Sequence, residues 1–270
     1  MHTWFIVILF AFLQGLTEFL PVSSSGHLAL LSNLSGLSPE NSITFSIVLH
    51  AGSLLAIVVF YFKTLLGFLK KDQLHLLLMV IIGSIPAGIV GVLLKKTGLI
   101  ELFFGDMLSL AMSFLITASL LHLTGKEKMR AKSETGLKDI SLKQTIIVGI
   151  AQAFAIVPGI SRSGSTIAAG ILSGIKFEAA AAFSFLLAIP AIAGATFLEV
   201  ISLAKLGFQT EEFSFLQLGA GLIVSAATSL ATLSLLIHLI RKGKLSWFSW
   251  YLFFLGIAVM IWQMLKLSKG

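Results

Sequence analysis

The stretch QGLTEFLPVSSSGH, residues 14–27, interrupts the first apolar segment of the chain and decides the fold. A second stretch of the same kind, PGISRSGST at residues 158–166, interrupts a later apolar segment. Both contain proline, glycine and serine, which end helices and form turns. In a membrane protein, such non-helical backbone is tolerated only where protein or a water-filled cavity satisfies it. Each stretch therefore predicts a re-entrant hairpin, a helix that breaks and turns back.

The composition of the whole chain indicates a membrane protein. Of its 270 residues, 57% are hydrophobic and the mean hydropathy is +1.00, whereas soluble domains are about 45–50% apolar. Eight apolar segments follow one another, at about 4–20, 43–62, 74–94, 103–124, 144–157, 179–203, 215–240 and 248–267. Six of these segments are long enough to span a bilayer, while the first and the fifth run into the two interrupting stretches. The expected fold class is an all-α polytopic membrane protein with six full transmembrane helices and two re-entrant helical hairpins.

Charge and cysteine content exclude several classes of protein. The formal net charge is +7, but the basic residues cluster in short loops beside apolar segments, so nucleic acid is not expected as a partner. The absence of cysteine excludes disulfides and thiol catalysis. The N-terminal sequence Met1-His2-Thr3-Trp4 has no basic region, so the first apolar segment is expected to be mature structure rather than a signal peptide.

The two interrupting stretches belong to an internal repeat. Shifting the chain against itself by 138 positions aligns the following pairs: Gln14 with Gln152, Ser23 with Ser161, Ser25 with Ser163, Gly26 with Gly164, and Phe45-Ser46 with Phe183-Ser184. We expect one membrane domain, 1–270, with repeat 1 at about 1–124, a cytoplasmic basic loop at about 125–143 and repeat 2 at about 144–267. Three spans beside each hairpin is an odd number, so the second repeat is inverted in the membrane.

The loop charges predict the orientation. Lys and Arg are concentrated in three loops, 63–73, 125–143 and 241–246, which carry 3, 6 and 3 of them. The other loops, 35–42, 95–106 and 204–214, carry 0, 2 and 1. The positive-inside rule places the first set in the cytoplasm and both termini outside. The first hairpin then enters from the outer face and the second from the inner face, so that their tips meet near the midplane.

Glu18 lies alone inside an apolar helix, four residues after Gln14, so the two side chains share a helix face directed toward the break at Pro21. A carboxylate at membrane depth is a candidate functional residue. The alternative is a snorkelling or protonated residue near a helix end.

The run Ser23-Ser24-Ser25-Gly26-His27 supplies hydroxyls and an imidazole within a few residues. A hydroxyl nucleophile needs a base within hydrogen-bond reach, and a carboxylate often orients that base. The alternative for the serines is a helix cap. The histidines His50, His75 and His122 lack such company, and we interpret them as satisfied or interfacial residues.

Arg162 is the one arginine of the sequence that lies within an apolar region, whereas Arg130 and Arg241 fall in predicted cytoplasmic loops. A guanidinium suits phosphate oxygens, and hydroxyls surround this one: Ser161, Ser163, Ser165 and Thr166. The structural alternative is an ion pair with Glu18, which would itself bring the two stretches together. A nucleotide-binding glycine motif is absent. This inventory fits phosphoryl transfer.

With these residues, the two stretches resemble the signature motifs of the bacterial undecaprenyl-diphosphatase family, also called the bacitracin resistance protein family, in sequence and in spacing. The resemblance implies hydrolysis of undecaprenyl diphosphate to undecaprenyl phosphate and inorganic phosphate, which recycles the lipid carrier for cell-wall synthesis and confers bacitracin resistance. It implies the bacterial cytoplasmic (inner) membrane, with the active site toward the outer, periplasmic side. The partners expected are the polyprenyl diphosphate substrate and membrane lipids, with a homodimer among the allowed states.

Carried over to this chain, the resemblance implies Ser24 as nucleophile or nucleophile-positioning hydroxyl and His27 as acid/base. Glu18 would orient His27 or help hold a metal, and Arg162 would clamp the diphosphate. The substrate-binding side chains would be Gln14, Ser25, Ser161, Ser163 and Thr166. Mg²⁺ or Ca²⁺ is implied by the resemblance alone. Many members have a second glutamate where this chain has Gln14, and an amide is a weaker metal ligand.

Two other functions use similar features. A secondary transporter or lipid flippase shares the inverted repeat with broken helices. An intramembrane serine protease shares the serine and the histidine, but the G-x-S-x-G motif is absent and a guanidinium suits phosphate better than a peptide carbonyl.

Overall fold

The computed structural model describes residues 2–36, 39–68, 70, 73–98, 106–125, 134–206 and 213–268. Within these residues the chain is helical, with one isolated bridge between Thr135 and Ile175 in place of any sheet. The helices are α1 (His2–Thr17), α2 (Ser24–Ser35), α3 (Pro39–Phe60), α4 (Phe62–Gly67), α5 (Leu74–Thr97), α7 (Met107–Thr124), α9 (Leu142–Phe154), α10 (Arg162–Leu172), α11 (Phe177–Leu206), α12 (Phe215–Arg241) and α13 (Ser246–Leu267), with a 3-10 turn η2 (Leu137–Asp139). The predicted all-α class is confirmed.

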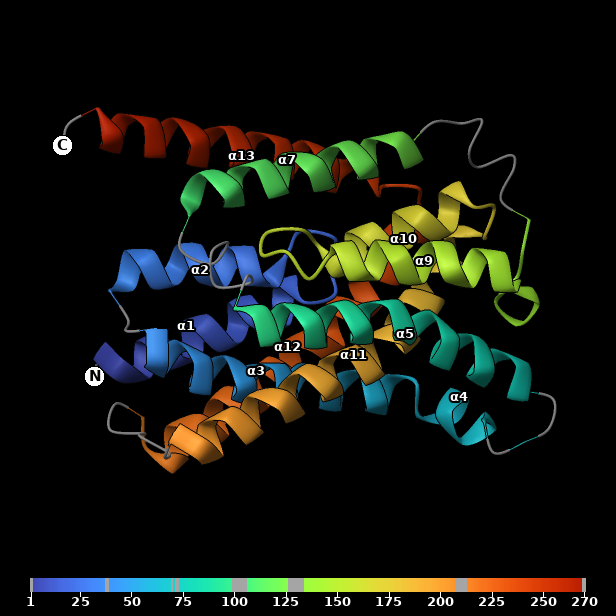
Figure 1. Cartoon of the computed structure of the whole chain (residues 1–270), viewed down its shortest axis with the longest axis horizontal. Helices are drawn as coiled ribbons and strands as arrows, with labels where there is room; N and C mark the ends of the chain where they lie inside the picture. The colour runs from blue at the N-terminus through green and yellow to red at the C-terminus, as the bar shows by residue number, and fades with distance from the viewer. Residues whose placement is uncertain are drawn as a thin grey trace.

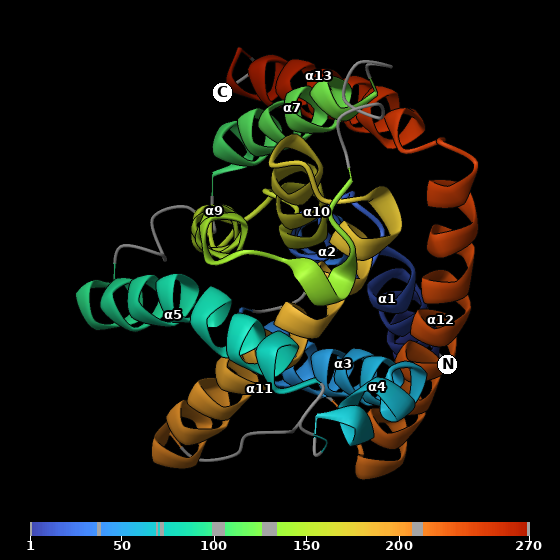
Figure 2. The same ribbon diagram turned by 90° about the vertical axis from the view of Figure 1, so that its right-hand side faces the viewer.

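The long helices run roughly along one axis of the molecule, and the two described ends of the chain lie at the same end of it (Figure 1). α7 and α13 form a pair on one side, as the view along the axis shows (Figure 2). α12 packs against both α1 and α3, whereas α5 packs against both α9 and α11. α1, α2, α9 and α10 therefore lie among the longer helices.

Five helices of the described part are long and apolar enough to cross a membrane: Leu74–Thr97, Met107–Thr124, Phe177–Ile201, Phe215–Arg241 and Ser246–Leu267. Large apolar side chains stay exposed on these helices, for example Phe197 and Phe254, as expected where lipid replaces water. The chain is a polytopic membrane protein. A sixth helix, α3, has a shorter apolar stretch, Phe45–Phe60.

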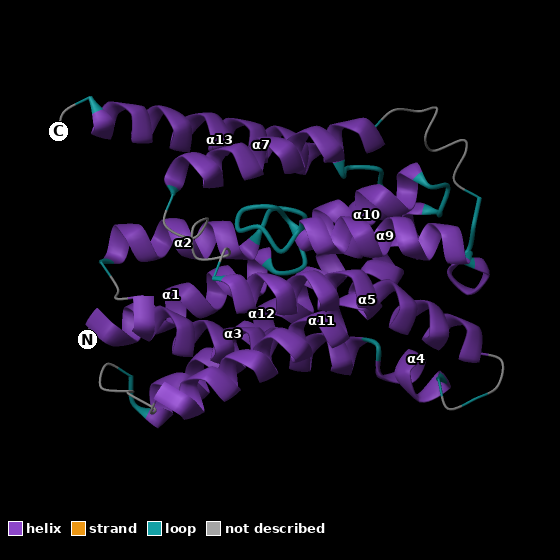
Figure 3. Ribbon diagram, in the orientation of Figure 1, coloured by secondary structure: helices purple, strands orange, loops and turns teal. Residues whose placement is uncertain are grey.

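Both helices that the sequence predicts to break do so. α1 ends at Thr17, and the turn through Pro21 leads into α2, which runs back beside α1 (Figure 1). α9 ends at Phe154, and the turn through Pro158 leads into α10, which runs back beside α9. The two loops face one another at the centre of the molecule (Figure 3).

Serines that the repeat aligns begin the returning helices. The Oγ atom of Ser23 caps α2 by accepting from the backbone N–H of Gly26, and that of Ser161 caps α10 by accepting from Gly164. Such caps satisfy helix N–H groups that lack an intrahelical partner. The backbone of Ser23 has φ 70°, a conformation that residues other than glycine rarely adopt. The turn backbone is held in this shape by its surroundings.

Glycines let the first helix of each hairpin approach its neighbour closely. A Cβ atom on Gly15 would lie 2.6 Å from the backbone oxygen of Ser225 in α12, and one on Gly149 would lie 2.6 Å from that of Gly83 in α5. Small residues give membrane helices the close packing that replaces a hydrophobic driving force. These contacts fix the depth at which the hairpins present their turns.

Candidate active site

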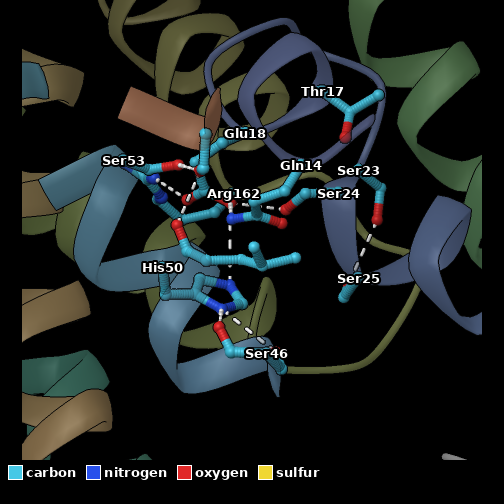
Figure 4. Close-up of polar contacts among 12 residues, drawn as sticks. Gln14, Thr17, Glu18, Ser23, Ser24, Ser25, Ser46, His50, Ser53 and Arg162 are labelled. Atoms are coloured by element: carbon cyan, nitrogen blue, oxygen red, sulfur yellow. Dashed lines mark hydrogen bonds and ion pairs between the residues drawn. The ribbon is translucent and has the colours of Figure 1, made fainter. Parts of the chain in front are cut away.

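An ion pair joins the two turns. Nη2 of Arg162 donates to Oε1 of Glu18 over 2.6 Å, although the residues are 144 positions apart (Figure 4). Their side chains are only 15% and 6% exposed. A charge buried in this way is tolerated when it is paired. The ion pair between Arg162 and Glu18, which the sequence offered as the structural alternative, is therefore present. It confirms that residues 14–27 and 158–166 meet.

Further hydrogen bonds tie the turns together. Oγ of Ser163 donates to the backbone oxygen of Leu20 at 2.9 Å, and the backbone N–H of Gly159 donates to Oγ of Ser25 at 3.4 Å. Ser25 and Ser163 were expected to bind substrate. In the structure their hydroxyls link the first hairpin to the second.

The second carboxylate oxygen of Glu18 accepts from two side chains of its own hairpin. Oγ of Ser24 donates to Oε2 at 2.5 Å, and Nε2 of Gln14 donates to the same oxygen at 3.1 Å. Ser24 therefore has the geometry of a hydroxyl whose proton a neighbouring base can take. That base is Glu18.

His50 of α3 also faces Glu18, which corrects the interpretation of this histidine as one without functional company. Its Nε2 lies 3.8 Å from Oε2 of Glu18. Its Nδ1 donates to the backbone oxygen of Ser46 at 2.8 Å and lies 3.1 Å from the Oγ atom of that serine. Ser46 stands four residues earlier, on the same helix face, and this spacing was the available sequence signal.

His27 does not contact Glu18 among the described interactions, so the expected orientation of His27 by Glu18 is wrong for this structure. Nδ1 of His27 donates to the backbone oxygen of Ser23 at 2.8 Å. Nε2 then accepts from the hydroxyl of Tyr251 in α13 at 2.6 Å, and the two rings are stacked 5.8 Å apart. Tyr251, which the sequence reading did not identify, holds His27 against the serine turn. His75 is satisfied as predicted, since it bonds the backbone oxygen of Ile140.

Hydroxyls around Arg162 hold α10 in place. The backbone N–H of Ser161 donates to Oγ1 of Thr117 at 3.1 Å. Oγ1 of Thr166 donates to the backbone oxygen of Arg162 at 2.8 Å and accepts from Oγ of Ser184 at 2.6 Å. Ser161 and Thr166, expected to bind substrate, are thus engaged with neighbouring protein groups that fix the position of Arg162.

A family model for "Bacitracin resistance protein BacA" matches residues 7–258. The chain belongs to this family. It is 37% identical over 263 residues to a protein of Halothermothrix orenii named undecaprenyl-diphosphatase, covering 95% of this chain and 97% of the relative. A protein of the same name from Carboxydothermus hydrogenoformans is 36% identical over 259 residues, covering 96% and 97%. One from Methanosphaera stadtmanae is 37% identical over 276 residues, covering 94% and 96%.

Buried atoms of the two motifs that have no hydrogen-bond partner among the described residues of this BacA-family chain are Nη1 of Arg162, Oε1 of Gln14 and Oγ of Ser165. A buried donor or acceptor that stays unpaired costs about 1–3 kcal/mol. The free guanidinium nitrogen lies beside the Ser24 and Glu18 pair and suits an anionic oxygen. Nη1 of Arg162 is therefore the natural contact for an anionic ligand.

The donor set does not fit a metal held by protein residues alone. Both oxygens of Glu18 already accept hydrogen bonds, and Arg162 places a positive charge 2.6 Å from one of them. No group of three or more His, Cys, Asp or Glu residues that could hold an ion occurs among the residues that the structure describes. Gln14 adds one neutral oxygen, whereas such ions prefer several oxygen ligands with carboxylates among them.

Proposed function

We propose that this chain hydrolyses undecaprenyl diphosphate to undecaprenyl phosphate and inorganic phosphate. One observation carries the proposal: a buried arginine with a free nitrogen stands beside a serine whose hydroxyl is bonded to a carboxylate. The family match and the name of the relatives, undecaprenyl-diphosphatase, support the same reaction. The reaction recycles the lipid carrier of cell-wall synthesis, and bacitracin resistance gives the family its name.

Ser24 acts as the nucleophile in this proposal. Glu18 takes the hydroxyl proton through the 2.5 Å hydrogen bond while Ser24 attacks the terminal phosphorus. A protonated Glu18 no longer carries the charge that holds Arg162, so the guanidinium turns to the phosphate oxygens. Arg162 then stabilises the charge of the transferred phosphoryl group, the usual contribution of an arginine in such reactions.

His27 has a positioning role in this mechanism, because both of its ring nitrogens are engaged. It bonds the backbone of Ser23, the residue before the nucleophile, and Tyr251 fixes the ring from the other side. The acid/base role expected for His27 is therefore assigned to Glu18. A divalent cation, expected from the family resemblance, has no step in this mechanism.

The proposed arrangement in the membrane is an inverted repeat with six spans and two re-entrant hairpins. The aligned residues Ser23 and Ser161 make equivalent caps, and each caps the helix that turns back. Helix packing follows the same correspondence. The shift aligns α1 with α9 and α5 with α12, and α1 packs against α12 just as α9 packs against α5. These pairs join a hairpin of one repeat to a span of the other. This matched packing supports repeats at about 1–124 and 144–267, separated by a basic loop.

The proposed location is the bacterial cytoplasmic membrane, with the site open to the outer, periplasmic side. Supporting this orientation, α4, which overlaps one of the loops rich in Lys and Arg, and the described end of α7, which precedes another, lie at the end of the molecule away from the termini (Figure 1). The polyprenyl diphosphate head then reaches the site from outside while its chain stays in lipid.

The test is phosphate release from undecaprenyl diphosphate by the purified protein in detergent. Replacing Ser24 or Arg162 by Ala should lower turnover at least about 100-fold, because each removes a group of the reacting centre. Ser119→Ala and Arg241→Ala are matched controls, since both residues are exposed and far from the turns in sequence. Lipid flux in vesicles without phosphate release would contradict the proposal and favour a transporter.

A further inference from the structure

The proposed hydrolysis has a proton balance that the site must meet. Near neutral pH, a diphosphate monoester with three negative charges and one water give two doubly charged phosphates and one proton. The proton first appears on Glu18, which takes it from Ser24. Since the turns are buried, this proton needs a path out of the site before Glu18 can act again.

Four side chains contact the carboxylate of Glu18: Gln14, Ser24, Arg162 and His50. An amide and an alcohol do not take up a proton at neutral pH, and a guanidinium already carries its full set. The imidazole of His50 is the contact with a lone pair of suitable basicity.

We propose that His50 removes the reaction proton from Glu18 and releases it to water, an inference that rests on the proposed hydrolysis. Because Nδ1 donates to the carbonyl of Ser46, the lone pair of the neutral ring is on Nε2, which faces Oε2 of Glu18 at 3.8 Å. A small side-chain movement brings the two atoms within hydrogen-bond distance. The side chain of His50 is 26% exposed and that of Glu18 is 6% exposed, so His50 is the less buried member of the pair.

The charges around His50 support this direction. Glu18 faces it from the turn after α1, and Glu199 of α11 interacts with it electrostatically. Glu199 also interacts with Lys95 of α5, whose Nζ donates to the backbone oxygen of Leu198. α12, the other helix packed against α3, contributes serine hydroxyls near this level. His50 therefore lies between two carboxylates, those of Glu18 and Glu199.

The steps balance. As the bond from Ser24 Oγ to phosphorus forms and the bridging P–O bond breaks, undecaprenyl phosphate leaves with that electron pair. The serine proton passes to Glu18, then to His50, then to water. In the second half, Glu18 takes a proton from the attacking water and returns it to Ser24 Oγ as the serine–phosphate bond breaks. One water is consumed and one proton leaves through His50.

The experiment compares kcat and KM across pH for the full-length protein and His50→Gln, with His122→Gln as the matched exposed control. In the wild type, kcat falls on the acid side, because a protonated imidazole accepts no further proton. His50→Gln should lower kcat about 100-fold, leave KM unchanged and abolish this limb. His27→Gln should retain the limb. Added imidazole should restore turnover to His50→Gly, as it replaces the missing base.

A second variant keeps the test decisive if the histidine substitutions do not fold. Glu199→Gln removes one of the two carboxylates that interact with His50, so the pH at which the acid limb occurs should change. Unchanged kcat in His50→Gln, or a limb that stays in place in both variants, would overturn the proposal. A wild-type protein that releases no phosphate would instead reject the hydrolysis itself.

Discussion

Glu18 contacts side chains from four segments of the chain, on α1, α2, α3 and α10. A single carboxylate thereby contacts the proposed nucleophile, the proposed phosphate-binding arginine and the proposed proton acceptor. Its neutral neighbour Gln14 adds no charge, so the protein charge beside Ser24 comes from one acid and one guanidinium. The chemistry of the site depends on how this one pair opens and closes.

Removing Arg162 alone should destabilise the protein, because Glu18 then stays buried without its cation. The loss is about 3–5 kcal/mol for a broken buried pair. The double variant Glu18→Gln/Arg162→Ala should regain much of this stability while remaining inactive. Thermal unfolding in detergent measures both effects, with Arg241→Ala as control. A melting temperature of Arg162→Ala equal to that of the wild type would show that the pair is not a stabilising contact.

Side chains of the two motifs could be predicted from sequence, because glutamate and arginine are rare inside apolar segments and so stand out. His50 and Tyr251 could not. Tyr251 is 224 positions from its partner His27, and His50 reaches Glu18 from a separate helix. Nothing local marks Tyr251, and the spacing of Ser46 and His50 indicates a shared helix face without showing that this face meets Glu18. For Ser25 and Ser163 the sequence identified the right residues, whereas their bonds between the turns depend on the fold.

At the scale of helices, the depth of each hairpin is set by contacts with a neighbouring span. Gly15→Ala should displace α1 from α12, because the added Cβ meets the backbone oxygen of Ser225. The expected cost is about 1–3 kcal/mol, with lower phosphate release as the Glu18 carboxylate moves. Unfolding and turnover are measured together. Gly88→Ala is the control, since no atom lies within 4 Å of its added Cβ; equal effects of both variants would contradict this account.

The breaks after α1 and α9 could be predicted because proline, glycine and serine act locally on the backbone. The short helix α4 and the turn η2 were missed, since six and three residues are too few for apolar periodicity to give a signal. Predicted boundaries of the long segments differ from the observed ones by a few residues. α3, for example, begins at Pro39 rather than near 43, because its first turn is polar.

At the scale of the whole molecule, the absence of cysteine offers a direct test of the proposed orientation. Thr97→Cys, at the end of α5, and Lys143→Cys, at the start of α9, place single thiols at exposed helix ends on opposite predicted sides. A membrane-impermeant maleimide should label Thr97→Cys in intact cells and Lys143→Cys only after the membrane is opened. The unsubstituted chain is the control. The reverse pattern would place the active site on the cytoplasmic side.

The sequence shift predicted which residues are equivalent, and the charges predicted which loops share a side. Neither predicts which spans touch, because lateral helix packing depends on surface shape over the whole bundle. The pairing of α7 with α13, for example, follows from contacts such as Ser249 Oγ donating to the backbone oxygen of Ala118. Such contacts carry no local sequence signature.

The ion pair between the turns also sets an order of events during biosynthesis. Glu18 and Arg162 are 144 positions apart, so at roughly 5–20 residues per second the ribosome adds the arginine roughly 7 to 30 seconds after the glutamate. Throughout that interval the newborn first hairpin carries a carboxylate without its counter-ion. Delivery of α10 into the nascent bundle is thus the moment at which the catalyst is completed, and a chain released before residue 162 remains inert however well its first half is inserted.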